Sequence, residues 1–299
     1  MNEKNNVFEK LSAAYTPILK DFSQSSNRTR FHIFSADYIV ESMKQNYQEG
    51  NYLYCIDALE NTRLAAATGL LRSYRWLQGM NEACSNSNYT IFCAGFRGFL
   101  LSAADNRHSL SRIPGTLADN ANLLHKLLSK NADDKTIYSL EVLESIFEHF
   151  LLARKQRVGE SLDPSHRAKQ DAEYIREWQG GSAGQICDCY AELCEITHPA
   201  SASVFSFIEE NLTDFNKETG TFLRTDLDST LISDFCQKYS PVIAKVFETA
   251  FNPSLLSLGL LNLTRNDFLF TPAINSFNLD FMPKWTEYKT TIVNAFGRT

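Results

Sequence analysis

The stretch Tyr89–Leu110, YTIFCAGFRGFLLSAADNRHSL, is nearly all apolar and predicts the central helix of this chain. Its interruptions are Arg97, Asp105, Arg107 and His108. A helix that is apolar on most of its sides is buried on most of its sides, so other helices must surround it. No run of alternating strands accompanies it, and the sequence therefore predicts an all-α, multi-helix bundle.

The neighbouring helices are predicted from apolar residues that recur every three or four positions. The polar side of the helix predicted over 52–83 is marked by Arg63, Arg72 and Arg75. The other predicted helices are 1–24 (kinked or divided at Pro17), Ser35 or Asp37 to Tyr47, 116–130 (capped by Thr116), 136–158, 165–179, 187–198, 201–211, 229–251 (bent at Pro241) and 285–296.

The sequence suggests three parts. Two N-terminal helices occupy 1–50, a helical core occupies 51–212, and a C-terminal helical extension occupies 213–299. A polar stretch near Lys217–Thr225 marks the second boundary. A Leu-rich segment follows at 255–263, and 267–280 has no helical period, which predicts an extended or irregular segment. No internal repeat is visible.

Composition places the chain among ordinary globular proteins. It has 299 residues, 43% of them hydrophobic and 21% charged, and a net charge of −6. The seven cysteines lack the spacing of a disulfide framework and favour a reducing compartment. No signal peptide and no apolar run long enough for a membrane span are seen. We therefore expect a cytoplasmic protein that does not insert into a membrane.

The stretch Cys187–Pro199, CDCYAELCEITHP, predicts a helix that stops at a His-Pro pair. Tyr190, Cys194 and His198 fall on one stripe of it, at i, i+4 and i+8. Pro199 disfavours the α conformation at the residue before it. His198 is therefore a candidate for a residue that is presented at the end of this helix.

Several kinds of site have no support in the sequence. One continuous helix cannot bring Cys187, Cys189, Cys194 and His198 into a zinc tetrahedron, because Cys189 points away from the other three. The chain has no phosphate-binding glycine loop and no G-x-S-x-G elbow. Cys194 and His198 are more simply packing neighbours than a nucleophile and its base. We expect no metal and no cofactor.

Arg97 is the charged residue that most needs an explanation, because an unpaired charge is costly in so apolar a helix. Two interpretations stay open. In the structural one, Arg97 pairs with Asp105, Glu144 or Glu148. In the functional one, its guanidinium is held ready for a phosphate. A mixed-charge segment rich in Arg and Lys, 154–176, is either a nucleic-acid surface or an ordinary solvated one.

Three segments resemble the HEPN-like bacterial proteins. FRGFLLSAAD, beginning at Phe96, resembles their aromatic-Arg-x-x-Leu-x-x-Ala helix, and YAELCEITHP, beginning at Tyr190, resembles their late Tyr-x-x-Leu-x-x-x-x-His-Pro helix. LESIFEHFLLARK, beginning at Leu143, resembles their central helix. The resemblance covers about residues 60–210, and it implies an all-α core that commonly forms a dimer.

The resemblance also implies an activity. Such proteins are often metal-independent ribonucleases of phage-defence or toxin-antitoxin systems, with an Arg-x(4–6)-His motif. His198 matches the histidine, which would act as general acid or base. The expected arginine position falls within 191–193, where this chain has Ala, Glu and Leu. Arg97 or Arg154 would then have to supply the positive charge from another helix.

The first functional hypothesis is therefore a HEPN-like defence or toxin-type protein with catalytic residues His198, Arg97 and Arg154. The alternative is a non-catalytic helical scaffold that acts through protein–protein contacts, for which 255–296 could be a surface. The expected partners are a second copy or the other subunits of a complex, and RNA under the first hypothesis. A small-molecule pocket between the helices is a third possibility.

Overall fold

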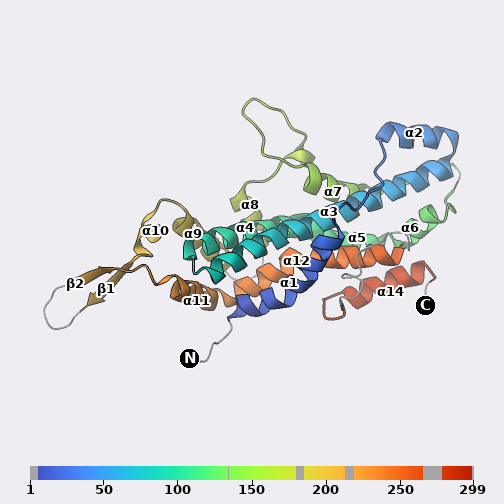
Figure 1. The fold of residues 1–299 in the computed structure, drawn as a ribbon. Coiled ribbons are helices and arrows are strands. Elements are labelled where there is room, and N and C mark those ends of the chain that lie inside the picture. The colour runs from blue at the N-terminus through green and yellow to red at the C-terminus, as the bar shows by residue number, and fades with distance from the viewer. Residues whose placement is uncertain (1–5, 134, 180–184, 213–218, 265–277, 298–299) are drawn as a thin grey trace. The chain divides into compact units, whose positions relative to one another are not determined.

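The computed structural model describes residues 6–133, 135–179, 185–212, 219–264 and 278–297. Within these ranges the chain is a multi-helix, all-α protein with one added two-stranded hairpin (Figure 1), so the predicted fold class is confirmed. Its helices are α1 (Val7–Ser25), α2 (Ala36–Gln45), α3 (Tyr47–Ser85), α4 (Tyr89–His108), α5 (Ile113–Asp119), α6 (Ala121–Leu128), α7 (Glu141–Leu152), α8 (Asp171–Gln179), α9 (Gln185–Thr197), α10 (Ser201–Phe205), α11 (Asp228–Lys238), α12 (Ser240–Thr264) and α14 (Trp285–Ala295).

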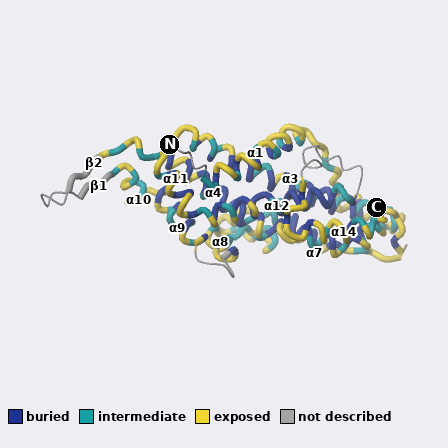
Figure 2. The backbone as a smooth tube through the Cα atoms, turned by 90° about the horizontal axis from the view of Figure 1, so that it is seen from below, coloured by how far each residue is buried: buried dark blue, intermediate teal, exposed yellow. Residues whose placement is uncertain are grey.

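The hairpin pairs β1 (Ile208–Leu212) with β2 (Thr219–Leu223) in antiparallel register, with Ile208 opposite Leu223. Short 3₁₀ turns lie at Leu110–Arg112 and Pro164–His166. Along α1 the buried residues recur about every turn, which is the helical periodicity seen in the sequence (Figure 2). No helix among the described residues is long and apolar enough to cross a membrane.

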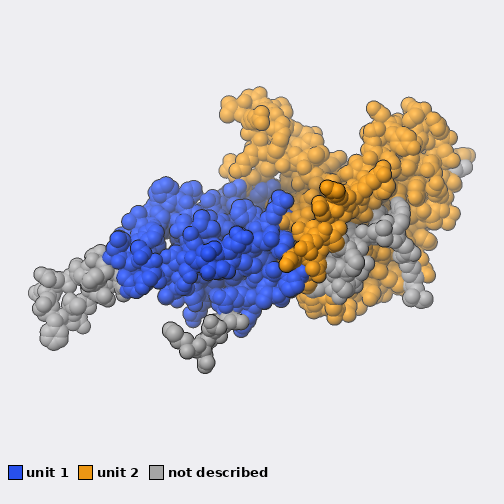
Figure 3. Space-filling model, in the orientation of Figure 1, with its two compact units in different colours: residues 1–17, 72–104, 171–248 blue, residues 18–71, 105–170, 249–299 orange. Residues whose placement is uncertain are grey.

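The chain forms two compact units, each assembled from separate stretches of sequence (Figure 3). Unit 1 comprises 1–17, 72–104 and 171–248, and unit 2 comprises 18–71, 105–170 and 249–299. Each unit draws residues from all three of the parts expected from the sequence. The division at residues 50 and 212 stays a prediction about sequence pattern.

Unit 1 is built around aromatic side chains from α1, α4, α11 and α12. The Phe92 ring lies edge-on to Phe8, with the centroids 5.3 Å apart, and Phe99 lies in the same way 5.2 Å from Phe247. Phe96 completes the cluster against Phe235 at 5.7 Å. Each such pair contributes about 0.5–1.5 kcal/mol beyond the burial of its area. The apolar α4 is thus central within this unit, as its sequence predicts.

Unit 2 buries the Leu-rich half of α12 together with parts of α3 and α4. The Asn106 amide, fully buried, donates to the Ala250 carbonyl at 2.9 Å. On α3 the buried Arg63 pairs with Glu60 at 3.1 Å and donates to the Arg30 carbonyl at 2.7 Å. The hydrogen bonds to the Ala250 and Arg30 carbonyls satisfy polar side-chain groups that would otherwise be costly inside an apolar core.

Several predicted helix boundaries are wrong, and each has a local cause. The helix predicted over 136–158 is only α7, because Ala153 turns extended (φ −65°, ψ 131°) and Arg154 then pairs its backbone with His166 and Ala168. The helix over 165–179 is reduced to a 3₁₀ turn followed by α8. The helix over 201–211 stops at Phe205, and β1 begins three residues later.

Other differences involve helix ends. The segment 116–130 is not one helix capped by Thr116, because α5 begins at Ile113 and breaks at Asn120. The segment 229–251 is not a helix bent at Pro241, because Pro241 sits in the first turn of α12, where its missing N–H has no partner to lose. Pro17 lies inside α1 without dividing it. Most of the irregular segment expected at 267–280 lies outside the described residues.

Candidate functional site

Helix α9 carries the His-Pro stretch as the sequence predicts. It buries Ile186, Cys189, Leu193 and Ile196 on one face and ends at Thr197. The His198 N–H still donates to the Cys194 carbonyl at 2.9 Å, and Pro199 then stops the helix. The His198 side chain is exposed, and within the described ranges its imidazole makes no hydrogen bond or ion pair. His198 is thus presented at a helix end, accessible to solvent.

Arg97 of α4 is half-buried and lies against α9 within unit 1. Its guanidinium carbon is 5.8 Å from the centre of the Tyr190 ring, a cation–π contact. Burial lowers the pKa of Arg97, but a hydrogen bond to Tyr190 and the nearby Cys194 and Asp171 raise it above its ordinary value. Arg97 is therefore a permanent cation held on the phenol of α9.

The partners that the sequence suggested for Arg97 are not found. Over the part of the chain that the structure describes, no carboxylate lies within 4.0 Å of its guanidinium, so Asp105, Glu144 and Glu148 form no ion pair with it. Its Nε atom is buried and has no hydrogen-bond partner. The aromatic contact with Tyr190 takes the place of the expected carboxylate.

Arg97 and His198 mark opposite ends of the α9 stripe. Tyr190, which Arg97 contacts, and His198 are eight positions apart, a separation of about 12 Å along a helix axis. Cys194, half-buried, lies between them on the stripe. The stripe therefore runs from the residue that contacts a half-buried cation to an exposed imidazole, and about two helical turns separate its two ends.

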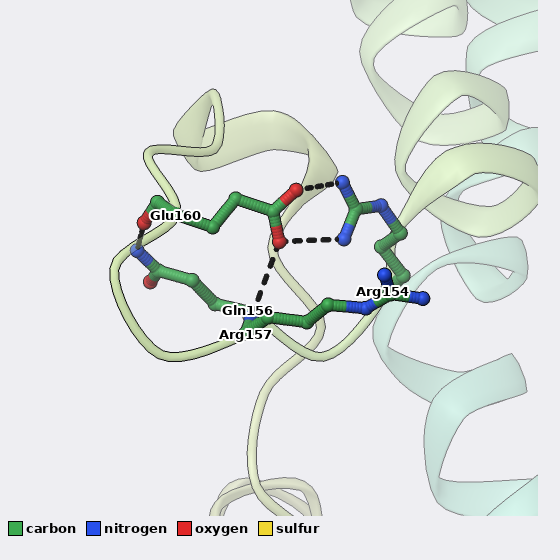
Figure 4. A network of polar contacts seen from close by, with 4 residues as sticks. All are labelled: Arg154, Gln156, Arg157 and Glu160. Atoms are coloured by element: carbon green, nitrogen blue, oxygen red, sulfur yellow. Dashed lines mark hydrogen bonds and ion pairs between the residues drawn. The ribbon is translucent and has the colours of Figure 1, made fainter.

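Arg154 lies in unit 2, just after the end of α7, and its guanidinium is already paired with a carboxylate. Its guanidinium makes a two-pronged ion pair with Glu160, with Nη1 2.8 Å from Oε2 and Nη2 bonded to Oε1 (Figure 4). The Arg157 backbone N–H adds a bond to the same carboxylate at 3.2 Å. These contacts lower the pKa of Glu160 to about 2, with the Arg154 hydrogen bond as the main cause. The ion pair between Arg154 and Glu160 thus joins the two ends of the loop 154–160.

The thiols of α9 do not gather around His198. Cys189 is on the buried face, where burial raises its pKa, whereas Cys187 and Cys194 are half-buried. All seven cysteines are free thiols. Among the described residues, no group of three or more His, Cys, Asp or Glu side chains has the arrangement of a metal site.

Sequence reasoning missed a pocket in unit 1 between α9, α10 and α11. It is an open depression of about 830 Å³. Its polar wall is the α9 stripe that contains Asp188, Glu192 and Glu195, at i, i+4 and i+7. This spacing is visible in the sequence and could have indicated one acidic face. Tyr89 from α4 and Leu231, Lys238 and Tyr239 from α11 and its end are distant in sequence, and no local pattern connects these with α9.

Apolar and aromatic side chains form the other walls of the pocket. They include Tyr89 from the start of α4, Leu231 and Tyr239 from α11 and its end, and Phe205 from α10. The Tyr89 N–H donates to the Asp228 carboxylate at 2.7 Å, which ties the first turn of α4 to the first turn of α11. The pocket is therefore framed by elements that hydrogen bonds and packing hold in place.

One of the three pocket carboxylates, that of Glu192, already has hydrogen-bond partners within the protein. The Tyr239 hydroxyl donates to Glu192 Oε2 at 2.6 Å, and the Lys238 ammonium bonds the same oxygen. Burial and this carboxylate raise the pKa of Tyr239. Asp188 and Glu195 are exposed and make no ion pair or side-chain hydrogen bond within the described ranges. The pocket thus keeps two carboxylates available for a cation from outside.

Comparison with known proteins adds no assignment, since the chain matches no protein-family model and no curated protein or solved structure is significantly similar to it.

Proposed function

We propose that this chain is a non-catalytic helical module that binds another protein through unit 1, as one subunit of a complex. The observation that carries the proposal is an exposed apolar strip next to the acidic pocket. It consists of Val204, Phe205 and Phe207, whose exposed fractions are 60%, 58% and 42%. Phe205 also lines the pocket itself.

This strip has the composition of an interaction surface. Single exposed apolar residues are common on protein surfaces. Three of them within four positions, beside a pocket, are unusual for a segment that only solvent covers. Aromatic side chains are enriched at the centres of protein interfaces, where they supply large areas of contact. By contrast, the residues proposed as catalytic have other contacts: Arg154 is engaged by Glu160, and Arg97 contacts Tyr190 two helical turns before His198.

Site-specific photocrosslinking tests this proposal in the source cells. A benzoylphenylalanine placed at Phe205 should give a discrete adduct with one protein, identified by mass spectrometry of the linked peptides. The matched control is the same residue at Val142, which is 48% exposed on α7. No adduct at Phe205, or the same adducts at both positions, would contradict the proposal.

A HEPN-like ribonuclease is the second candidate function, and a specific observation favours it. Arg97 is cationic and without a carboxylate partner among the described residues, while His198 is exposed at the helix end that resembles the HEPN histidine. An imidazole there could exchange protons with the ribose or the leaving oxygen, and the guanidinium could bind a phosphate. The seven free thiols are consistent with a cytoplasmic setting, such as a phage-defence or toxin-type system.

Cleavage of a mixed RNA pool in the presence of EDTA tests the ribonuclease. If it is correct, His198→Ala should lower the rate by about 10²–10⁴-fold, the usual contribution of a general acid or base. Arg97→Met should also be impaired. Arg154→Met is the control, because Arg154 is already paired with Glu160. Equal cleavage by wild type and His198→Ala would exclude this function.

A further inference from the structure

We infer that the pocket between α9, α10 and α11 is the docking site for a basic, amphipathic segment of a protein partner. Its Lys or Arg side chains would bind Asp188 and Glu195, and its aliphatic side chains would pack on Phe205. This inference rests on the proposed function and adds the chemistry of the partner.

The negative charge of the pocket favours a partner segment that carries positive charge. Three carboxylates and one ammonium line it, and that ammonium, Lys238, is bonded to Glu192. Asp188 and Glu195 are left exposed, with no ion pair to any described residue. An anionic partner, nucleic acid included, would be repelled at this site, whereas a cationic segment would be attracted and steered toward it.

The spacing of the two available carboxylates fits a peptide. Asp188 and Glu195 are seven positions apart on α9, which separates them by about 10 Å along the axis. Basic side chains at i and i+7 of a helical segment have the same separation. The small side chains of Ala191 and Ala202 line the space between the walls and leave room for a partner side chain. Phe205 and Leu231 offer apolar contact on the opposite side.

A second copy of this chain is a poorer occupant. The chain carries a net charge of −6, and each copy would bring its own acidic pocket to the contact. Like charges placed at an interface oppose association. The structure therefore favours a different, basic partner over self-association at this site.

Fluorescence anisotropy with a defined probe tests the inference on the full chain. The probe is a fluorescein-labelled 15-residue amphipathic peptide of Leu, Ala and Lys, with Lys at positions seven apart. The wild type should bind it at 50 mM NaCl and more weakly at 300 mM, because added salt screens the carboxylates. The double variant Asp188→Asn/Glu195→Gln and the variant Phe205→Ser should each weaken binding at least tenfold.

A matched double variant controls for general loss of charge. Asp234→Asn/Glu287→Gln removes two exposed carboxylates that do not line the pocket and should change the Kd by less than twofold. Circular dichroism and thermal melting show that each variant is folded. No binding of the Lys peptide by the wild type, or equal weakening by both double variants, would overturn the inference.

Three further outcomes would overturn the inference in distinguishable ways. Equal binding of a peptide with Glu in place of Lys would remove the charge argument. Spermine that displaces the peptide at equal affinity would assign the pocket to small cations. Self-association that Asp188→Asn/Glu195→Gln abolishes would assign it to a second copy. If the peptide fails but an adduct still forms at Phe205, the proposed function stands and only the partner's chemistry is wrong.

Discussion

Arg154 and Arg97 show how much the role of an arginine depends on its first neighbours. Both were candidates to supply positive charge to a phosphate. Arg154 meets a carboxylate six residues along the chain and is neutralised by it, whereas Arg97 meets the face of a phenol. An ion pair with a carboxylate competes with phosphate for the guanidinium donors, and an aromatic contact leaves most of them open. Only Arg97 keeps a functional hypothesis.

The Arg154–Glu160 contact predicts a measurable titration. Glu160 has a pKa of about 2 in the folded protein against 4.5 ordinarily, so the contact favours the folded loop above pH 4.5 and loses that effect as the pH falls toward 2. In Arg154→Gln the pKa should rise toward 4.5, followed by carboxyl NMR shifts. Arg157→Gln is the control, because only the backbone of Arg157 contacts Glu160. A Glu160 pKa unchanged by Arg154→Gln would refute the assignment.

The buried Arg63 predicts a large loss of stability. Its side chain and that of Glu60 are 6% and 2% exposed, so Arg63→Met leaves a carboxylate buried without its cation. Such a change costs about 3–5 kcal/mol in the free energy of unfolding. Urea denaturation should show this loss for Arg63→Met but less than about 1 kcal/mol for Arg75→Met, which alters an exposed arginine of the same helix. Equal losses would mean that the pair is not the cause.

Sequence patterns predicted individual helices better than they predicted contacts between distant segments. Helix α3, predicted over 52–83, spans Tyr47–Ser85, and α4 begins at Tyr89 as expected. Ser35 caps α2, accepting a bond from the Tyr38 N–H at 3.3 Å. These features depend on residues three or four positions apart, and the sequence displays such relations directly. The end of α7 depends instead on a backbone pairing between Arg154 and 166–168, which no i, i+4 pattern reveals.

Two glycines of α3 give opposite predictions for the same substitution. A Cβ at Gly69 would lie 2.6 Å from Leu110 Cδ1 and 3.2 Å from Phe150 Cζ, so Gly69→Ala overpacks the core of unit 2 and should cost about 1–3 kcal/mol. A Cβ at Gly79 meets nothing within 4 Å, so Gly79→Ala should add about 0.4–1 kcal/mol by restricting the unfolded chain. Thermal or urea unfolding compares them directly. The same sign for both variants would contradict this account.

At the scale of the whole molecule, we expect the net negative charge to oppose association between copies. The net charge of −6 at pH 7 falls to zero near pH 5.6. Mutual repulsion between copies then disappears, and the exposed apolar strip of Val204, Phe205 and Phe207 is no longer protected by it. Light scattering in 20 mM salt should therefore show greatest self-association near pH 5.6 and least above pH 7. Scattering that does not change with pH would contradict this prediction.

The sequence by itself determined the all-α fold, the centrality of α4, and the presentation of His198 at a helix end. Each follows from local periodicity or from proline, which act within one or two turns. Tertiary structure alone decided that Arg97 contacts Tyr190, that Arg154 closes a loop with Glu160, and that α9, α10 and α11 border an open acidic pocket that Phe205 also lines. These arrangements need residues tens to more than a hundred positions apart, or a backbone turn that breaks the helical period. The packing of helices against one another decides these contacts. A pattern along the sequence does not show which helix faces will pack together.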